Sequence, residues 1–170
     1  AGNLNIVNLV TGNYVLNIAC YGDSIDTVTS TIYIDGWITS PNSFVRVYTP
    51  YLLSEVGVSQ RHSGVWDDSK YVVYGNNIMD LIWTVGDFIR LEGLQVFHKA
   101  SGTSSCDTFH PSVNNPNSDQ RFEKMIVKGD FAGLTTGLAI GFDQSSGSGP
   151  RRLKIANNIF YDYVSSSNVS

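Results

Sequence analysis

A chain of 170 residues is long enough for one domain with its own hydrophobic core, and we expect a single domain over 1–170. The net charge is −4, so no basic excess is available to neutralise nucleic-acid phosphates or an anionic membrane surface. No apolar run approaches the roughly 18 residues of a membrane span. Abundant Ser, Thr, Asn and Gly are typical of a secreted all-β protein, so we expect an extracellular or cell-surface location.

The first 43 residues predict short strands that form an N-terminal cap. Two strands, 4–7 and 14–18, are separated by a turn at Gly12-Asn13. Residues 27–37, rich in Thr, Ile and Tyr, favour a further strand. The apolar segment 4–20 could then cover one open end of the fold.

Strands follow one another more densely from residue 44 onward. Residues 51–69 indicate a loop, and the polar stretch 98–120, with two prolines and many Ser and Asn, is predicted to be a loop insertion. A second loop at 144–150 and a polar tail at 165–170 complete the irregular segments. The remaining strands are expected at 44–48, 70–75, 79–85, 88–97, 122–131, 137–143 and 151–163.

One short pattern recurs four times: apolar, any, apolar, any, then Gly or Asn. Such alternation is typical of a strand that stops at a sharp bend, because Gly and Asn tolerate left-handed φ. The copies are unevenly spaced, which favours a coil of parallel strands with extruded loops. We therefore predict a β-solenoid with rungs at 44–97 and 122–163. The four copies are Tyr71–Asn77, Ile89–Gly93, Met125–Gly129 and Leu153–Asn158.

The same alternation assigns an inner face to these strands. The pairs Asn76-Asn77 and Asn157-Asn158 predict side-chain amides that stack from rung to rung at a repeated bend. The residues predicted to face inward are Val73, Ile89, Leu91, Val96, Met125, Val127, Leu153, Ile155 and Phe160.

Six residue strings, in this order, resemble the N-terminal part of right-handed parallel β-helix proteins of the pectin-lyase-like superfamily. The nearest resemblance is to uncharacterised bacterial surface and metagenomic members, and it covers residues 14–97 well and 122–163 loosely. It implies an all-β, right-handed parallel β-helix, here of few rungs with extruded loops. That fold hosts lyases, hydrolases, phage spikes and adhesins alike. The strings are Ala19–Asp23, Ile34–Trp37, Val45–Pro50, Glu55–Gly57, Arg61–Asp67 and Phe88–Val96, and Leu153–Phe160 resembles later rungs.

Lyases of this superfamily need clustered carboxylates for calcium and an Arg that abstracts a proton. The candidate doublets are Asp67-Asp68 and Arg151-Arg152, but adjacent strand residues point to opposite faces, so solvated loop pairs are favoured. We therefore predict no catalytic set and no metal ligands, with calcium as the one cofactor that the resemblance leaves open. The chain as an enzyme is the less favoured interpretation.

The chain has three histidines that are candidate site residues: His62, His98 and His110. A metal or acid–base site of His98, His110 and Asp107 would form if the insertion 98–120 folded back. The spacing matches no ligand pattern, so surface histidines are the favoured interpretation.

Aromatic residues cluster between 48 and 97, and exposed Tyr and Trp stack on sugar rings or anchor interfaces. Four are candidates for ligand binding: Tyr48, Tyr51, Trp66 and Tyr74. The alternative, which is favoured, is that most aromatic residues belong to the core, Trp83 above all.

Two cysteines, Cys20 and Cys106, permit one disulfide. The equally favoured alternative is two separate thiols, with Cys20 buried on an apolar strand. Neither belongs to a CxxC pair, which argues against a zinc or redox role.

A solenoid exposes unpaired backbone groups at both ends, and these could pair with another copy. Head-to-tail pairing does not close and would yield a filament. We therefore expect a non-catalytic structural or adhesive module that self-associates. The alternatives are a polysaccharide-acting enzyme or binding module and a fragment of a phage tail spike or adhesin. The self-association candidates are Ile6, Val7, Leu9, Val10, Ile155 and Ile159.

Overall fold

The computed structural model describes residues 6–101, 105–113, 115–131, 136–141, 143–144 and 150–163. The predicted strands 4–7 and 137–143, the loop 144–150 and the tail 165–170 lie wholly or partly outside these residues. Within the described ranges the one helix is α1 (Leu53–Val56), which is far too short to cross a membrane.

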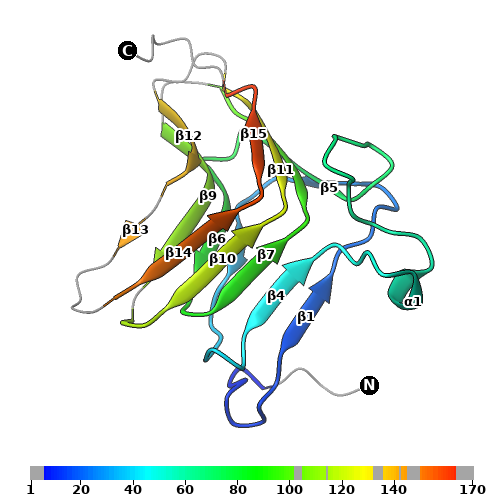
Figure 1. Cartoon of the computed structure of the whole chain (residues 1–170). Coiled ribbons are helices and arrows are strands. Elements are labelled where there is room, and N and C mark those ends of the chain that lie inside the picture. The colour runs from blue at the N-terminus through cyan, green and yellow to red at the C-terminus, as the bar shows by residue number, and fades with distance from the viewer. Residues whose placement is uncertain are drawn as a thin grey trace.

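Three sheets of parallel strands make up the structure (Figure 1). Sheet 1 contains β1 (Leu16–Ala19), β4 (Val45–Tyr48), β7 (Ile89–Glu92), β10 (Asp119–Glu123) and β14 (Arg152–Ala156). Sheet 2 contains β2 (Ile25–Val28), β5 (Val72–Asn76), β8 (Gln95–Lys99), β11 (Ile126–Asp130) and β15 (Ile159–Tyr161). Sheet 3 contains β3 (Ile32–Ile34), β6 (Asp80–Val85), β9 (Ser105–Val113), β12 (Thr136–Ile140) and β13 (Asp143–Gln144).

The chain visits the sheets in a constant order, sheet 1, then sheet 2, then sheet 3, and we call one such passage a coil. Each strand pairs in parallel with the strand of the same sheet in the neighbouring coil. The predicted all-β architecture of stacked parallel strands is therefore confirmed, and it is consistent with a parallel β-solenoid.

Parallel register stacks apolar side chains in columns inside the coils. One interior column of sheet 1 runs Ile18, Val47, Leu91, Phe122 and Ile155. Phe122, which has a neighbour on either side in this column, is 0% exposed, whereas Ile18 and Ile155 at the ends are 42% and 47% exposed. The end residues are exposed because the described strands cover each of them from one side only.

Most of the residues predicted to face inward do so. Leu153 and Phe160 pack against the core while partly exposed. Ile155 also lies in an interior column, in register with Phe122, but it is not buried, because β14 is the outermost described strand of sheet 1. Six others are buried in the core: Val73, Ile89, Leu91, Val96, Met125 and Val127.

Residues 98–120 are not a loop insertion, and this prediction is wrong. Strand β9 occupies 105–113 and pairs with both β6 and β12, and Phe109 on it is buried in the core. The polar side chains that suggested a loop find partners within the fold. Thr108 bonds the ring of His98, and Ser112 accepts a hydrogen bond from Trp83.

The N-terminal residues form strands, but these are not a separate cap. The first three strands pair with β4, β5 and β6 as part of the three sheets, and the single strand expected at 27–37 is two, β2 and β3. Leu9 covers part of the end of the fold formed by the first three strands, and its N–H donates to the carbonyl of Ile38 at 3.0 Å. Leu9 is buried in the core, so its assignment to a self-association surface is wrong.

In the last three coils a two-residue link joins sheet 1 to sheet 2, and each of these links begins with a residue at positive φ: Gly93 at 76°, Lys124 at 57° and Asn157 at 57°. Asn158 completes the last link by accepting from the Met125 N–H at 2.8 Å. Asn77 has the same conformation, but it follows β5 at a different corner. The predicted asparagine ladder is therefore wrong, because the two pairs do not stack.

The interior column of sheet 1 provides a stability test with a control in the same column. We expect Phe122→Ala to lower the free energy of unfolding by about 3–5 kcal/mol, because it leaves a cavity among buried neighbours. Ile155→Ala at the exposed end of the column should cost about 1 kcal/mol or less. Urea denaturation of both variants measures the difference, and equal losses would contradict the assigned column.

Candidate functional site

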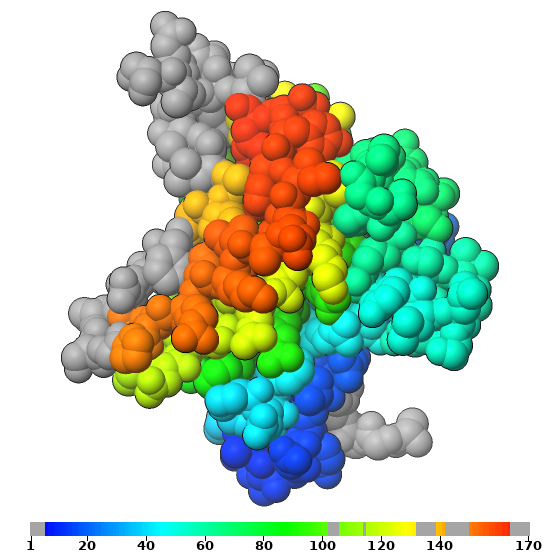
Figure 2. Space-filling model, viewed as in Figure 1, coloured from blue at the N-terminus to red at the C-terminus, as the bar shows by residue number. Residues whose placement is uncertain are grey.

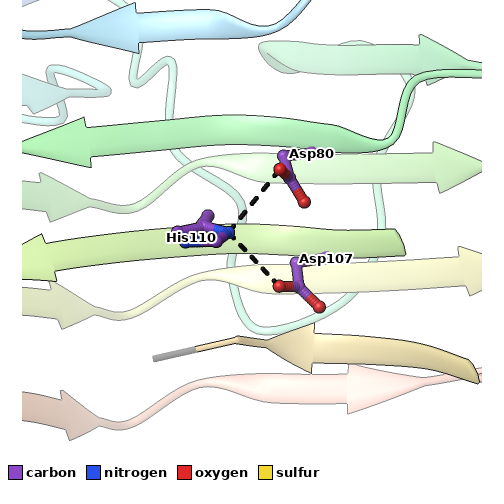
Figure 3. Close-up of side chains that lie close together, drawn as sticks. All are labelled: Asp80, Asp107 and His110. Carbon is purple, nitrogen blue, oxygen red and sulfur yellow. Dashed lines mark ion pairs between the residues drawn. The ribbon is translucent and has the colours of Figure 1, made fainter. Parts of the chain in front are cut away.

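The outer face of sheet 3 brings two carboxylates and an imidazole together (Figure 3). Asp80 begins β6, and Asp107 and His110 lie on the adjacent β9. The Nδ1 atom of His110 is 3.6 Å from Oδ2 of Asp80 and 3.4 Å from Oδ2 of Asp107. The three side chains are only 16–19% exposed, so this is a largely enclosed cluster. We call it the Asp-Asp-His cluster.

Aromatic stacking holds the imidazole in place. Trp83 stacks on His110 with ring centroids 4.2 Å apart, and Tyr33 stacks on Trp83 at 5.5 Å. Register explains this column, because Tyr33 pairs with Trp83 and Trp83 pairs with His110. Trp83 therefore lies on the outer face of sheet 3 and not in the core. On the far side Gly141 lies against Asp107, where a Cβ would come within 1.8 Å of Oδ2.

The electrostatics of the cluster are dominated by burial and by the proximity of like charges. Burial raises the pKa of Asp107, the negative charge of Asp80 raises it further, and His110 partly offsets both effects. Both ring nitrogens of His110 are shielded from solvent, and neither makes a hydrogen bond within the part of the chain that the structure describes. The cluster thus holds two closely spaced acids beside an imidazole that has no hydrogen-bond partner among the described residues.

The site of His98, His110 and Asp107 considered from sequence forms only in part. Asp107 and His110 meet, but His98 is fully buried inside the coil, with Nε2 2.8 Å from the carbonyl oxygen of Ile78. In its place comes Asp80, which sequence reasoning missed. A signal exists in the spacing, because the register pairs Asp80 with Asp107 and Trp83 with His110, both 27 residues apart (107 − 80 and 110 − 83).

The outer face of sheet 1 carries a column of arginines, Arg46, Arg90 and Arg121, which are register neighbours. The three carboxylates on these strands are all paired with cations. Glu92 binds Arg46 at 2.6 Å, and Asp119 binds Arg121 at 2.8 Å. Glu123 pairs with Lys154, and further cations on Glu92 and Asp119 are Arg61, Lys124 and Arg152.

Arg90 differs from its neighbours, because it forms no ion pair with any carboxylate in the described part of the chain. Its guanidinium lies over the ring of Phe44, 3.4 Å from the centroid. Burial lowers the pKa of Arg90, and the positive charge of Arg121 lowers it further. A half-buried cation between two other cations is a favourable place for an anionic ligand.

Two hollows adjoin on this face, with volumes of about 420 and 430 Å³. Arg90 and Arg121 line both, so the hollows meet at the unpaired guanidinium. Phe88 and Asp119 also line the first, and Phe44 lines the second. Figure 2 shows this face, with the strands of sheet 1 as adjacent bands from blue through green to orange. We call this surface the arginine groove.

Two of the predicted ligand-binding aromatics, Trp66 and Tyr74, line a hollow of about 390 Å³ on the outer face of sheet 2. Tyr74 packs on Phe97 at 5.2 Å between ring centroids, and the Nζ of Lys128 lies 5.0 Å above the Phe97 ring. The loop that follows β4 supplies Trp66. It is held to the sheet where the side-chain oxygen of Gln95 accepts from the Asp67 N–H at 2.7 Å.

The other two predicted aromatics lie near the Glu92 network, Tyr48 as the register partner of Glu92 and Tyr51 against Arg61. Tyr48 is buried, and its hydroxyl donates to Glu55, so its assignment to a ligand-binding surface is wrong. Tyr51 is exposed and lies under the guanidinium of Arg61 at 4.3 Å. The four aromatics therefore do not form one site.

The carboxylate and arginine doublets lie on different faces. Asp67 accepts hydrogen bonds from the N–H and hydroxyl of Ser69, and Asp68 accepts one from Trp66. Arg151 and Arg152 line the arginine groove instead.

Both cysteines are free and buried, so the disulfide is not formed and the alternative of two separate thiols holds. Cys20 belongs to the main core, and burial raises its pKa to about 11. Cys106 lies in a small second cluster with Ala100 and Phe131.

The Glu92 network predicts a pH dependence of stability. Burial alone would raise the pKa of Glu92, but hydrogen bonds from Arg46 and Lys124 and the charge of Arg61 lower it to about 2. The stabilisation is therefore present above the unfolded pKa of roughly 4.3 and is lost as the pH falls towards 2. Glu92→Gln should remove roughly 1–3 kcal/mol of this acid-sensitive stability.

Urea denaturation between pH 7 and 2 tests this expectation. Glu123→Gln, at the next position of the same column, is the control, because Glu123 has one ion-pair partner where Glu92 has three. Identical pH profiles for the wild type and Glu92→Gln would show that the network does not act in this way.

No protein-family model, curated protein or solved structure matches the chain. The resemblance to the pectin-lyase-like superfamily therefore stays a prediction. The function has to be argued from the geometry of the arginine groove, the aromatic hollow and the Asp-Asp-His cluster.

Proposed function

We propose that the protein is a non-catalytic extracellular module that binds acidic polysaccharide in the arginine groove. The scaffold for this module would be a right-handed parallel β-helix of few rungs, similar to the pectin-lyase-like superfamily. The observation that carries the proposal is Arg90, a guanidinium that lines both hollows and has no carboxylate partner in the described chain.

The chemistry of the groove suits a polymer with a carboxylate on each sugar. Guanidinium groups bind carboxylates through two parallel hydrogen bonds, and register places Arg46, Arg90 and Arg121 on neighbouring strands about 4.8 Å apart. Phe44 and Phe88 supply apolar surface for the faces of sugar rings. The net charge of −4 belongs to the whole chain, whereas sheet 1 carries five cations against three carboxylates.

Binding is favoured over lyase chemistry because each carboxylate of sheet 1 is engaged by a cation. Glu92, Asp119 and Glu123 form ion pairs, and a calcium ion would have to displace those cations. A lyase that uses calcium, the activity that the resemblance implies, therefore ranks below simple binding at this face.

The binding proposal predicts a specific effect of one substitution. Arg90→Gln should weaken binding of polygalacturonate about tenfold or more, because a charge-assisted pair is lost. Lys99→Gln on sheet 2, which removes a cation paired with Asp130, should leave the affinity unchanged. Isothermal titration at two salt concentrations measures both, with neutral dextran as the non-binding polymer.

The same samples, incubated with polygalacturonate and calcium, distinguish binding from cleavage. Unsaturated uronate products would replace the binding proposal with a lyase. Equal affinity of the wild type and Arg90→Gln, or equal binding of dextran, would refute the assigned groove.

A second candidate function is self-association through the ends of the coil, with a second copy of this chain as the partner. Its specific observation is that exposed isoleucines stand at both ends of two columns: Ile18 and Ile155 in sheet 1, and Ile25 and Ile159 in sheet 2. Head-to-tail stacking would continue both columns with aliphatic contacts. Ile6, Val7 and Val10 are also exposed at the first end.

One residue, Asp26, makes self-association less favoured than polysaccharide binding. Asp26 pairs in register with the core residue Val73, so an exposed carboxylate occupies an interior column at the first end. Inward charges on edge strands oppose pairing with another chain. A second copy would have to accommodate this charge next to its own Phe160, which belongs to the same column.

Self-association predicts assembly that depends on concentration and on the end residues. Ile155→Lys should reduce the assembled fraction in analytical ultracentrifugation, whereas Val65→Lys, at an exposed position on the loop, should not. Electron microscopy of the wild type would then show filaments. Monodisperse particles at every concentration would remove this candidate and, with it, a filament-forming role.

A further inference from the structure

We propose that the Asp-Asp-His cluster binds one divalent transition-metal ion of the zinc class, with Asp80, Asp107 and His110 as its ligands. This site lies on the outer face of sheet 3, away from the strands that form the arginine groove, so it does not depend on the proposed polysaccharide binding.

The distances fit a shared ion better than direct hydrogen bonds. A nitrogen–oxygen hydrogen bond has its usual length near 2.9 Å, whereas Nδ1 of His110 lies 3.4 and 3.6 Å from the two carboxylate oxygens. In a tetrahedral zinc site with bonds of about 2.0–2.2 Å, ligand atoms lie roughly 3.3–3.6 Å from one another. The three ligand atoms all lie within 4.8 Å of one another, so one ion between them would be within reach of all three side chains.

No other group in the described chain claims these donors. Both nitrogens of His110 are enclosed and make no hydrogen bond to any described residue, which is unusual because buried polar atoms are normally paired. Neither Asp80 nor Asp107 forms an ion pair with Lys or Arg in the described residues. Two enclosed carboxylates side by side repel each other, and a divalent cation would offset that repulsion directly.

The donor set selects the class of metal. One imidazole and two carboxylates suit zinc and related ions, whereas calcium and magnesium prefer oxygen donors alone. Three protein ligands leave one position of a tetrahedron for water. Trp83 stacks on His110 at 4.2 Å and fixes the orientation of its ring. The fluorescence of Trp83 can therefore report on metal binding at the site.

Titration of the full chain with zinc at neutral pH tests the proposal. We expect one ion to bind, and His110→Gln or Asp80→Asn to weaken the affinity by at least about a hundredfold, since both remove a ligand. His62→Gln, which removes another imidazole that lies beside the Lys124 carbonyl, is the matched control and should bind as the wild type does. Calcium in excess should not compete.

A second measurement uses the tryptophan. Nickel or copper ions should quench the fluorescence of the wild type, the quenching should disappear in His110→Gln, and Trp83→Phe should lose most of the quenching while it still binds zinc. Circular dichroism establishes that each variant is folded before titration. Absence of zinc binding, or binding that survives both His110→Gln and Asp80→Asn, would overturn the proposal and leave His110 as an imidazole packed between two carboxylates.

Discussion

The parallel register between neighbouring coils is the constraint on which the other features depend. Ladder hydrogen bonds fix which residue lies above which, and a slip of one residue would turn every interior side chain outward. Val47, Leu91 and Phe122 share an interior column because of this register. The same rule places Arg90 between Arg46 and Arg121 on the outside. One pattern of hydrogen bonds therefore builds both the core and the surface chemistry.

Stacking like residues has an electrostatic cost on the outer faces, and the structure offsets that cost in two ways. On sheet 1 a column of carboxylates, Glu92 and Glu123, runs beside the arginine column and neutralises most of it. On sheet 3 the one basic group beside Asp80 and Asp107, within the described residues, is His110. Each face keeps one charge that is not balanced: Arg90 on sheet 1 and the pair of aspartates on sheet 3. A ligand of opposite charge would gain the most binding energy at these two places.

Local patterns predicted the core well and the polar strand badly. Val73, Val96 and Val127 follow the alternation and are buried, because each is apolar and flanked by residues that face outward. Strand β9 was missed because its polar residues are paired with distant partners, such as Thr108 with His98. A hydroxyl that is paired inside a sheet cannot be distinguished, from sequence, from one that is solvated in a loop.

The sequence by itself determined most of the apolar strand segments and the bends that end them, but not the polar strand β9. Alternation and tolerance of left-handed φ are properties of a few adjacent residues, as at Gly93 and Asn157. Only the tertiary structure decided which residues meet from coil to coil. Register partners are 27 residues apart at Asp80 and Asp107 but 44 apart at Arg46 and Arg90 (90 − 46). Loops of different length at the corners cause this variation, so no fixed period in the sequence could bring either site together.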